Sequence, residues 1–172
     1  MTTLPITRRL SWAVLLTLPL LFSQCSKKGT DVVPSAAALQ GSWRLSAYTI
    51  DPAYDLLGTG TKTNDLLVLF KALGGQQLVD CFKATTITFN ANGKVTSTTT
   101  AACTSVEASP IESGATWVLT GNKLKITEGS DVTESEVSIS GNTLRIFRQE
   151  TEDFDDDGKN DTATLSLILT KV

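Results

Sequence analysis

The chain of 172 residues contains no histidine, which excludes every site that depends on an imidazole. Ser-His-Asp triads, Cys-His dyads and imidazole-rich metal centres are therefore ruled out. Three cysteines are too few for a four-thiolate zinc site. Basic residues are also in the minority, with 15 Lys and Arg against 18 Asp and Glu. The resulting net charge of −3 argues against nucleic acid as a partner, because phosphate binding requires a basic face.

Residues 1–24 have the pattern of a secretory signal peptide. Two arginines, Arg8 and Arg9, precede an apolar run that is shorter than the ~20 residues needed to cross a bilayer. The segment LFSQC at residues 21–25 resembles the lipobox of bacterial lipoproteins, in which cleavage occurs before a diacylated cysteine. We therefore predict that Cys25 is lipidated and anchors the protein to a membrane. The expected location is the outer membrane of the cell envelope, on either its periplasmic or its surface face. An ordinary signal peptide followed by a chance cysteine is the alternative.

Residues 25–40 continue from Cys25 with small and polar side chains around Pro34 and predict a flexible tether. A single folded domain is then expected over residues 41–172. Its apolar residues alternate with polar ones, which is the period of a β-strand with one buried face. Together with one polar strand, the alternating runs give eight strands, at residues 43–48, 86–89, 94–100, 116–120, 123–126, 136–139, 144–147 and 165–170.

Short turns between these runs favour antiparallel neighbours. The sequence thus predicts an all-β fold, an eight-stranded antiparallel up-and-down barrel, with a β-sandwich as the alternative. In the first strand, Ala47 is expected on the same inner face as Trp43 and Leu45. One short helix is predicted at residues 63–75, within a long connection at residues 51–83. Its C-terminal end is expected at Gly74, and its nearly all-round apolar surface predicts burial.

The sequence Gly41-Ser42-Trp43 is similar to the G-x-W opening of lipocalins. Together with the later strand pattern it resembles the lipocalin-like lipoproteins of Bacteroidetes-type bacteria. The resemblance implies a barrel that holds a small apolar molecule, with the connection at residues 51–83 as a lid. It also implies a basic residue against the tryptophan, a place that Lys171 can fill. The same apolar side chains serve as either core or pocket lining; they are Trp43, Leu66, Phe70, Phe89 and Trp117.

Cys81 and Cys103 are predicted to form a structural disulfide. If Gly93 takes the left-handed position of the turn at residues 91–93, paired residue numbers in that hairpin add up to 184. The two cysteines satisfy the same relation, which places them opposite each other across the hairpin. A redox-active pair is the alternative, but close C-x-x-C spacing is missing.

Residues 153–161, with the sequence DFDDDGKND, have the spacing of a calcium-binding loop. The expected ligands are the side chains of Asp153, Asp155, Asp157 and Asp161 and the carbonyl of Lys159. The segment resembles calcium loops of EF-hand-like and thrombospondin-type repeats, although Thr164 stands where an EF-hand has its bidentate Glu. A solvated hairpin tip without metal is the alternative.

The leading functional hypothesis is a non-enzymatic protein that binds a small hydrophobic molecule in its barrel, with calcium as a structural ion. A structural or interaction protein whose barrel is filled by its own side chains is the second hypothesis. An enzyme that uses carboxylates alone is the third. The first two differ in whether the barrel interior retains a cavity.

Overall fold

The computed structural model describes residues 33–106 and 109–172. The predicted signal peptide over residues 1–24, the predicted lipidation site at Cys25 and most of the predicted tether lie outside these residues. The described residues form one compact unit.

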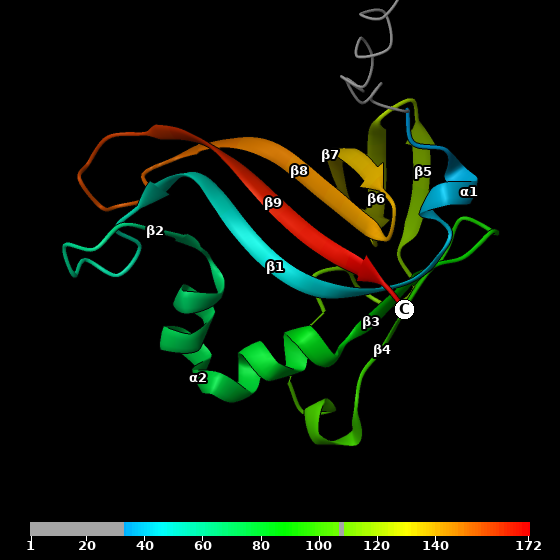
Figure 1. The fold of residues 1–172 in the computed structure, drawn as a ribbon, viewed down its shortest axis with the longest axis horizontal. Coiled ribbons are helices and arrows are strands. Elements are labelled where there is room, and N and C mark those ends of the chain that lie inside the picture. The colour runs from blue at the N-terminus through cyan, green and yellow to red at the C-terminus, as the bar shows by residue number, and fades with distance from the viewer. Residues whose placement is uncertain (1–32, 107–108) are drawn as a thin grey trace, which may run out of the picture. The chain divides into compact units, whose positions relative to one another are not determined.

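Nine β-strands among the described residues form one antiparallel sheet, and eight of them make up a barrel (Figure 1). The strands are β1 (Gly41–Tyr54), β2 (Thr63–Asp65), β3 (Thr86–Phe89), β4 (Val95–Thr98), β5 (Thr116–Thr120), β6 (Lys123–Glu128), β7 (Asp131–Ser140), β8 (Thr143–Glu152) and β9 (Asp161–Lys171). Their order is β4-β3-β1-β9-β8-β7-β6-β5, and the short β2 pairs with β1.

The barrel closes where β4 and β5, the two strands at the ends of this order, meet. The closure is not complete, because few backbone contacts join these two strands. Lys94 and Thr116 form an isolated bridge. The amide of Val95 donates to the carbonyl of Ala115 at 2.7 Å. The prediction of an eight-stranded antiparallel up-and-down barrel is therefore confirmed.

The inward face of β1 changes part-way along the strand. The pairing of β1 with β9 shifts by one residue around Ser46, whose hydroxyl donates to the carbonyl of Ile168 at 2.9 Å. Such a β-bulge reverses the alternation of side chains beyond it. Leu45 is buried before the bulge, and Tyr48 takes the inward position after it. The prediction that Ala47 shares the inner face is wrong for this reason.

The helix after the first strand, α2 (Leu67–Ala84), begins later and ends later than predicted. The residues of β2 pair with β1 instead of starting the helix, and Asp65 Oδ1 accepts the amide of Leu67 at 2.9 Å. Gly75, with φ of +75°, breaks the helix near the predicted end, but a second helical segment follows it. Leu73 is 77% exposed, so the prediction of a helix buried all round is wrong.

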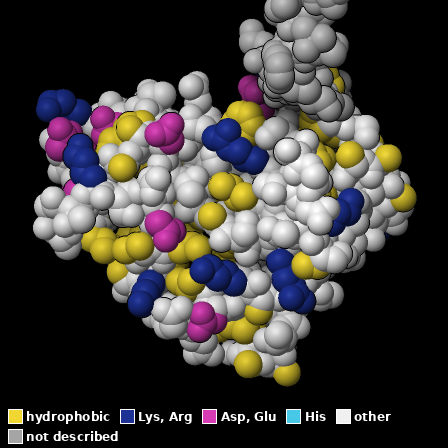
Figure 2. Space-filling model, in the orientation of Figure 1, with side chains coloured by type: hydrophobic (Ala, Val, Ile, Leu, Met, Phe, Trp, Pro, Cys, Tyr) yellow, Lys and Arg dark blue, Asp and Glu magenta, His cyan; other side chains and the backbone are white. Residues whose placement is uncertain are grey.

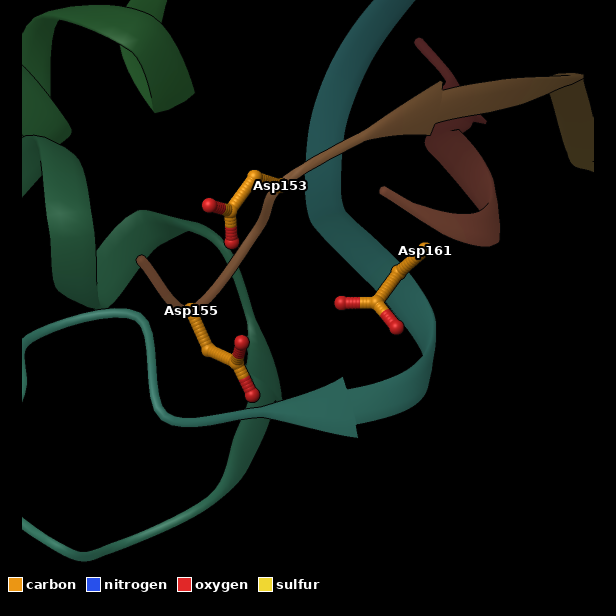
Figure 3. Close-up of side chains that lie close together, drawn as sticks. All are labelled: Asp153, Asp155 and Asp161. Atoms are coloured by element: carbon orange, nitrogen blue, oxygen red, sulfur yellow. The ribbon is translucent and has the colours of Figure 1, made fainter. Parts of the chain in front are cut away.

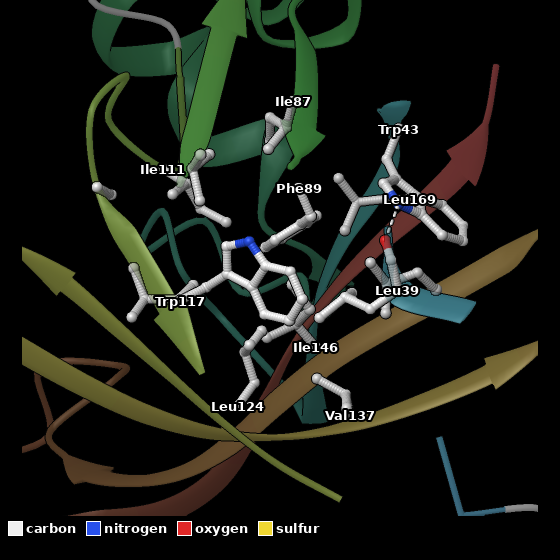
Figure 4. Close-up of a cluster of buried hydrophobic side chains, with 14 residues drawn as sticks. Leu39, Trp43, Ile87, Phe89, Ile111, Trp117, Leu124, Val137, Ile146 and Leu169 are labelled. Carbon is white, nitrogen blue, oxygen red and sulfur yellow. Dashed lines mark hydrogen bonds between the residues drawn. The ribbon is translucent and has the colours of Figure 1, made fainter. Parts of the chain in front are cut away.

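The main core fills the half of the barrel in which all eight strands take part (Figure 4). Two short helices flank the strands, α1 (Ala36–Leu39) and the 3₁₀ helix η1 (Ala101–Cys103). Leu39, the last residue of α1, is completely buried in this core, although it lies two residues before Gly41, where the sequence predicts that the domain begins.

The surface carries charges of both signs. On the face drawn in Figure 2, acidic and basic side chains are interspersed among apolar and neutral ones. In the described part of the chain, no helix has both the length and the apolar character needed to cross a membrane.

Candidate functional site

A pocket of about 290 Å³ lies beside the main core, between α2 and the inner face of the sheet. This volume is at the small end of the range for sites that take small molecules. The pocket is lined by Leu45, Tyr48, Phe70, Phe82, Ser109, Pro110, Ile111, Ile126, Thr133, Ser135, Ile146, Phe147, Arg148, Leu165 and Leu167. The interior of the barrel is therefore partly filled by core and partly hollow.

Aromatic side chains join α2 to the sheet along one wall of the pocket. The rings of Tyr48 and Phe70 stack with centroids 5.8 Å apart and planes 14° apart. Phe70 also contacts Phe82, with centroids 5.1 Å apart. These contacts hold both segments of α2 against β1, since Phe70 precedes the break at Gly75 and Phe82 follows it. The result is a continuous aromatic wall formed by Tyr48, Phe70 and Phe82.

Polar side chains also line the pocket, namely Ser109, Thr133, Ser135 and Arg148. Arg148 is the one charged residue that lines the pocket in the described part of the chain, and it forms an ion pair with Glu150. Burial raises the pKa of the Tyr48 phenol; Arg148 partly offsets this rise, and Glu150 adds to it. Tyr48 therefore remains a neutral hydroxyl at physiological pH and can donate a hydrogen bond.

Of the five side chains expected to line a pocket, Phe70 alone does so. Trp43, Phe89 and Trp117 belong to the main core, in which the rings of Phe89 and Trp117 meet edge to face at 5.8 Å. Leu66 packs in a separate cluster with Tyr54. These four side chains therefore pack in hydrophobic clusters, and other residues line the pocket.

Sequence analysis missed Tyr48 and Arg148 for different reasons. Tyr48 was assigned to the outer face, because a β-bulge leaves no unambiguous pattern in the sequence. Arg148 had a usable signal: it follows Leu144 and Ile146 at the same two-residue period, which places it on the inner face. A charge on the inner face of a strand marks a candidate binding residue.

A second site lies at the hairpin between β8 and β9. The carboxylates of Asp153, Asp155 and Asp161 offer oxygens within 4.8 Å of one another (Figure 3). Asp155 Oδ1 is buried and has no hydrogen-bond partner among the described residues. Burial raises the pKa of Asp161, and the nearby carboxylates of Asp155, Asp157 and Asp153 raise it further. Mutual repulsion of this kind is relieved by a cation.

The remaining residues of the expected metal loop are arranged differently. The carboxylate of Asp157 accepts the amide of Lys159 at 2.8 Å and its ammonium group at 3.1 Å, so it is not one of the three converging side chains. Asp153 accepts the amides of Asp157 and Gly158 at 3.0 and 2.8 Å, which shapes the turn. Gly158 has a φ of +84°, as the predicted sharp bend requires.

The predicted disulfide between Cys81 and Cys103 is present, with an S–S distance of 2.01 Å and Cα atoms 5.5 Å apart. The hairpin register is also as expected, since residues 86–89 pair with residues 95–98 and Gly93 has a φ of +77°. The cysteines themselves lie beyond the ladder, in α2 and η1 rather than on facing strands. The disulfide therefore ties the second segment of α2 to the loop after β4.

Comparison with protein-family models matches residues 39–146 of the chain to the lipocalin-like domain. The match covers more than half of the chain and includes seven of the eight barrel strands in part or in full. The chain belongs to the lipocalin-like domain family. Searches of curated proteins and of solved structures found no significant match.

The lipocalin-like domain uses its G-x-W segment to close one end of the core. The indole of Trp43 donates to the carbonyl of Leu39 at 2.8 Å, and the ammonium group of Lys171 lies 5.0 Å from its ring centroid. Gly41 has a φ of +119°, and a Cβ atom there would lie 3.1 Å from Cε of Lys171. The positive φ favours glycine at this position, and the absence of a Cβ leaves room for Lys171 to lie over Trp43.

Proposed function

We propose that this chain is an exported, lipid-anchored lipocalin-like protein of the Bacteroidetes type that binds a small hydrophobic molecule without catalysing a reaction. The observation that carries the proposal is the pocket of about 290 Å³ between α2 and the sheet. Its apolar wall and its volume favour one small ligand. The lipocalin-like fold is in general a binding fold, which is consistent with this role.

The binding function is tested with N-phenyl-1-naphthylamine, a neutral fluorescent probe, on the Cys25→Ser chain. We expect Leu167→Trp to weaken probe binding by about tenfold, because the larger side chain takes up volume in the pocket that Leu167 lines. Val118→Trp is the matched control, since Val118 is 60% exposed and lies outside the pocket. Equal affinities in both variants would contradict the proposed pocket.

Native mass spectrometry of the same chain, isolated from its own cell envelope, separates the two main hypotheses. A reproducible additional mass of a few hundred daltons is the expected result for a protein with a pocket ligand. A protein mass without any addition favours a structural or interaction role, for which the densely filled main core is the supporting observation.

The membrane anchor is proposed from the sequence, since Cys25 lies outside the described residues. We expect Cys25→Ser to move the protein from the membrane pellet to the soluble fraction, because each buried acyl methylene contributes ~0.8 kcal/mol to membrane binding. Ser26→Ala, a change at the next residue, is expected to leave the protein in the pellet. Retention of Cys25→Ser in the pellet would argue against lipidation.

A structural calcium ion in the β8–β9 hairpin is the second part of the proposal. It is supported by the converging carboxylates of Asp153, Asp155 and Asp161 and by the unpartnered buried oxygen of Asp155. Carboxylate oxygens are the ligands that Ca²⁺ prefers, and a site with few of them belongs to the weak, extracellular class.

Calcium at 10 mM is expected to raise the melting temperature of chelator-treated protein by about 4–8 °C, if the Kd is ~0.1–1 mM. Asp155→Asn is expected to abolish the shift, because it removes a converging charge. Asp156→Asn removes one charge from the same loop outside the carboxylate group and is expected to keep the shift. Absence of a shift in the unmodified chain, or an equal shift in Asp155→Asn, would refute this site.

A further inference from the structure

We infer that the pocket opens through the barrel wall between β7 and β8, and that its ligand is an amphiphile whose anionic head group binds Arg148 in that opening. The inference rests on the proposed function, because it specifies the chemical class of the pocket ligand and the place of its polar end.

The opening follows from where the β7–β8 ladder stops. The two strands pair between Glu136 with Phe147 and Ser140 with Thr143, and no further pair precedes Glu136. Residues 131–135 of β7 pair with β6 alone, whereas residues 148–152 of β8 pair with β9 alone. In Figure 1 the far ends of β8, β9 and β1 extend away from β5, β6 and β7. The barrel wall is therefore interrupted at this point.

Two cavities meet at the same place. A hollow of about 620 Å³ on the outer side of the sheet is lined by charged side chains of both signs. Lys123, Arg145 and Arg148 are the basic ones, and Glu134 and Glu136 are the acidic ones. Ser135, Phe147 and Arg148 line both this outer hollow and the inner pocket. The shared residues lie at the end of the ladder, so the pocket communicates with solvent between Ser135 and Arg148.

Arg148 has unused hydrogen-bond donors in this opening. The side chain of Arg148 is 43% exposed, and Glu150 meets its guanidinium group at Nε. Its Nη groups make no hydrogen bond to any residue that the structure describes. A guanidinium group has five N–H donors and binds a carboxylate or phosphate with two of them at once. The neutral hydroxyl of Tyr48 lies in the same pocket as a further donor. No acidic side chain lines the pocket within residues 33–106 and 109–172.

The rest of the pocket suits the apolar part of such a ligand. Leu167 and Ile146 pair across β9 and β8 and face Phe70 on α2, deeper in the barrel than Arg148. The volume of about 290 Å³ leaves room for one small apolar group such as a single alkyl chain. A ligand with its head group at the opening would contact Arg148, and its apolar chain would contact Leu167, Ile146 and Phe70 deeper in the pocket.

The test compares three ligands with the same alkyl chain, decanoic acid, decanol and decylamine, in displacement of N-phenyl-1-naphthylamine from the full chain carrying Cys25→Ser. We expect decanoate to bind at least about tenfold more tightly than decanol, because hydrogen bonds to a charged group are the stronger ones. Arg148→Gln is expected to lower the decanoate-to-decanol affinity ratio by about tenfold. Arg44→Gln removes the same charge from an exposed position outside the pocket and is expected to keep the ratio.

The possible outcomes separate this inference from the proposed function. Equal binding of decanoate and decanol, tighter binding of decylamine, or an unchanged ratio in Arg148→Gln would overturn the head-group inference while the pocket still binds apolar chains. If the probe and all three ligands fail to bind, both the inference and the proposed function are wrong. Unfolding midpoints of both arginine variants close to that of the parent chain show that the ratio reports on binding.

Discussion

Trp43→Ala is expected to lower the free energy of unfolding by about 3–5 kcal/mol, the cost of removing a large aromatic side chain from a packed core. Trp43 is completely buried, and its indole N–H donates to the carbonyl of Leu39. The substitution leaves a cavity among the core residues and removes this hydrogen bond. It also leaves the ammonium group of Lys171 without the ring that it covers.

Equilibrium unfolding in urea measures this loss. Arg44→Ala, at the adjacent residue whose side chain is exposed, is the control and is expected to change the free energy of unfolding by less than about 1 kcal/mol. Trp43→Phe keeps part of the volume and loses the N–H donor, so it is expected to fall between the two. A cost near 1 kcal/mol for Trp43→Ala would show that the α1 end of the barrel is not part of the cooperative core.

Removal of the disulfide is expected to have the second largest effect. Cys81 and Cys103 are separated by 22 residues, and the entropy of closing a loop of that length corresponds to about 3 kcal/mol in the chain-entropy treatment. Both cysteines are at least 95% buried, so Ala is a suitable replacement for each. The double variant Cys81→Ala/Cys103→Ala is expected to unfold at lower urea concentration by a corresponding amount.

The same variant is expected to weaken ligand binding. Phe82 lines the pocket and follows Cys81 directly in the chain, so the disulfide helps to hold this wall in place. Treatment with a reductant provides the control, because it is expected to destabilise the parent chain and to leave the double variant unchanged. Unfolding of the parent chain that does not respond to a reductant would contradict a stabilising role of the disulfide.

Local patterns determined a large part of the fold. Alternating apolar residues and short Gly-Asn turns led to the eight-stranded antiparallel barrel, because the period of two is imposed by the geometry of each strand. The turn at Gly93 led to the correct register of β3 and β4. It also led to the correct pairing of Cys81 with Cys103, although these residues lie in α2 and η1 and not on facing strands. Such features depend on residues close together in the sequence, and they can be derived from it directly.

The candidate site depends on longer-range features. The β-bulge at Ser46 turns Tyr48 inward, and it exists because β1 pairs with β9, more than a hundred residues later. The premature end of the β7–β8 ladder brings Arg148 to an opening in the barrel wall. Neither the bulge nor the end of the ladder has a local sequence signature, since each depends on how side chains pack across the whole sheet.

The sequence by itself thus determined the class of fold, the disulfide pair and the position of the aspartate-rich loop at residues 153–161. Tertiary structure alone decided which aromatic residues became core and which became pocket: Trp43, Phe89 and Trp117 pack where all eight strands surround them, whereas Phe70 lies where the strands separate. The physical reason is that the hydrophobic effect is non-directional: it favours removal of apolar side chains from water but does not specify whether they fill a core or line a pocket.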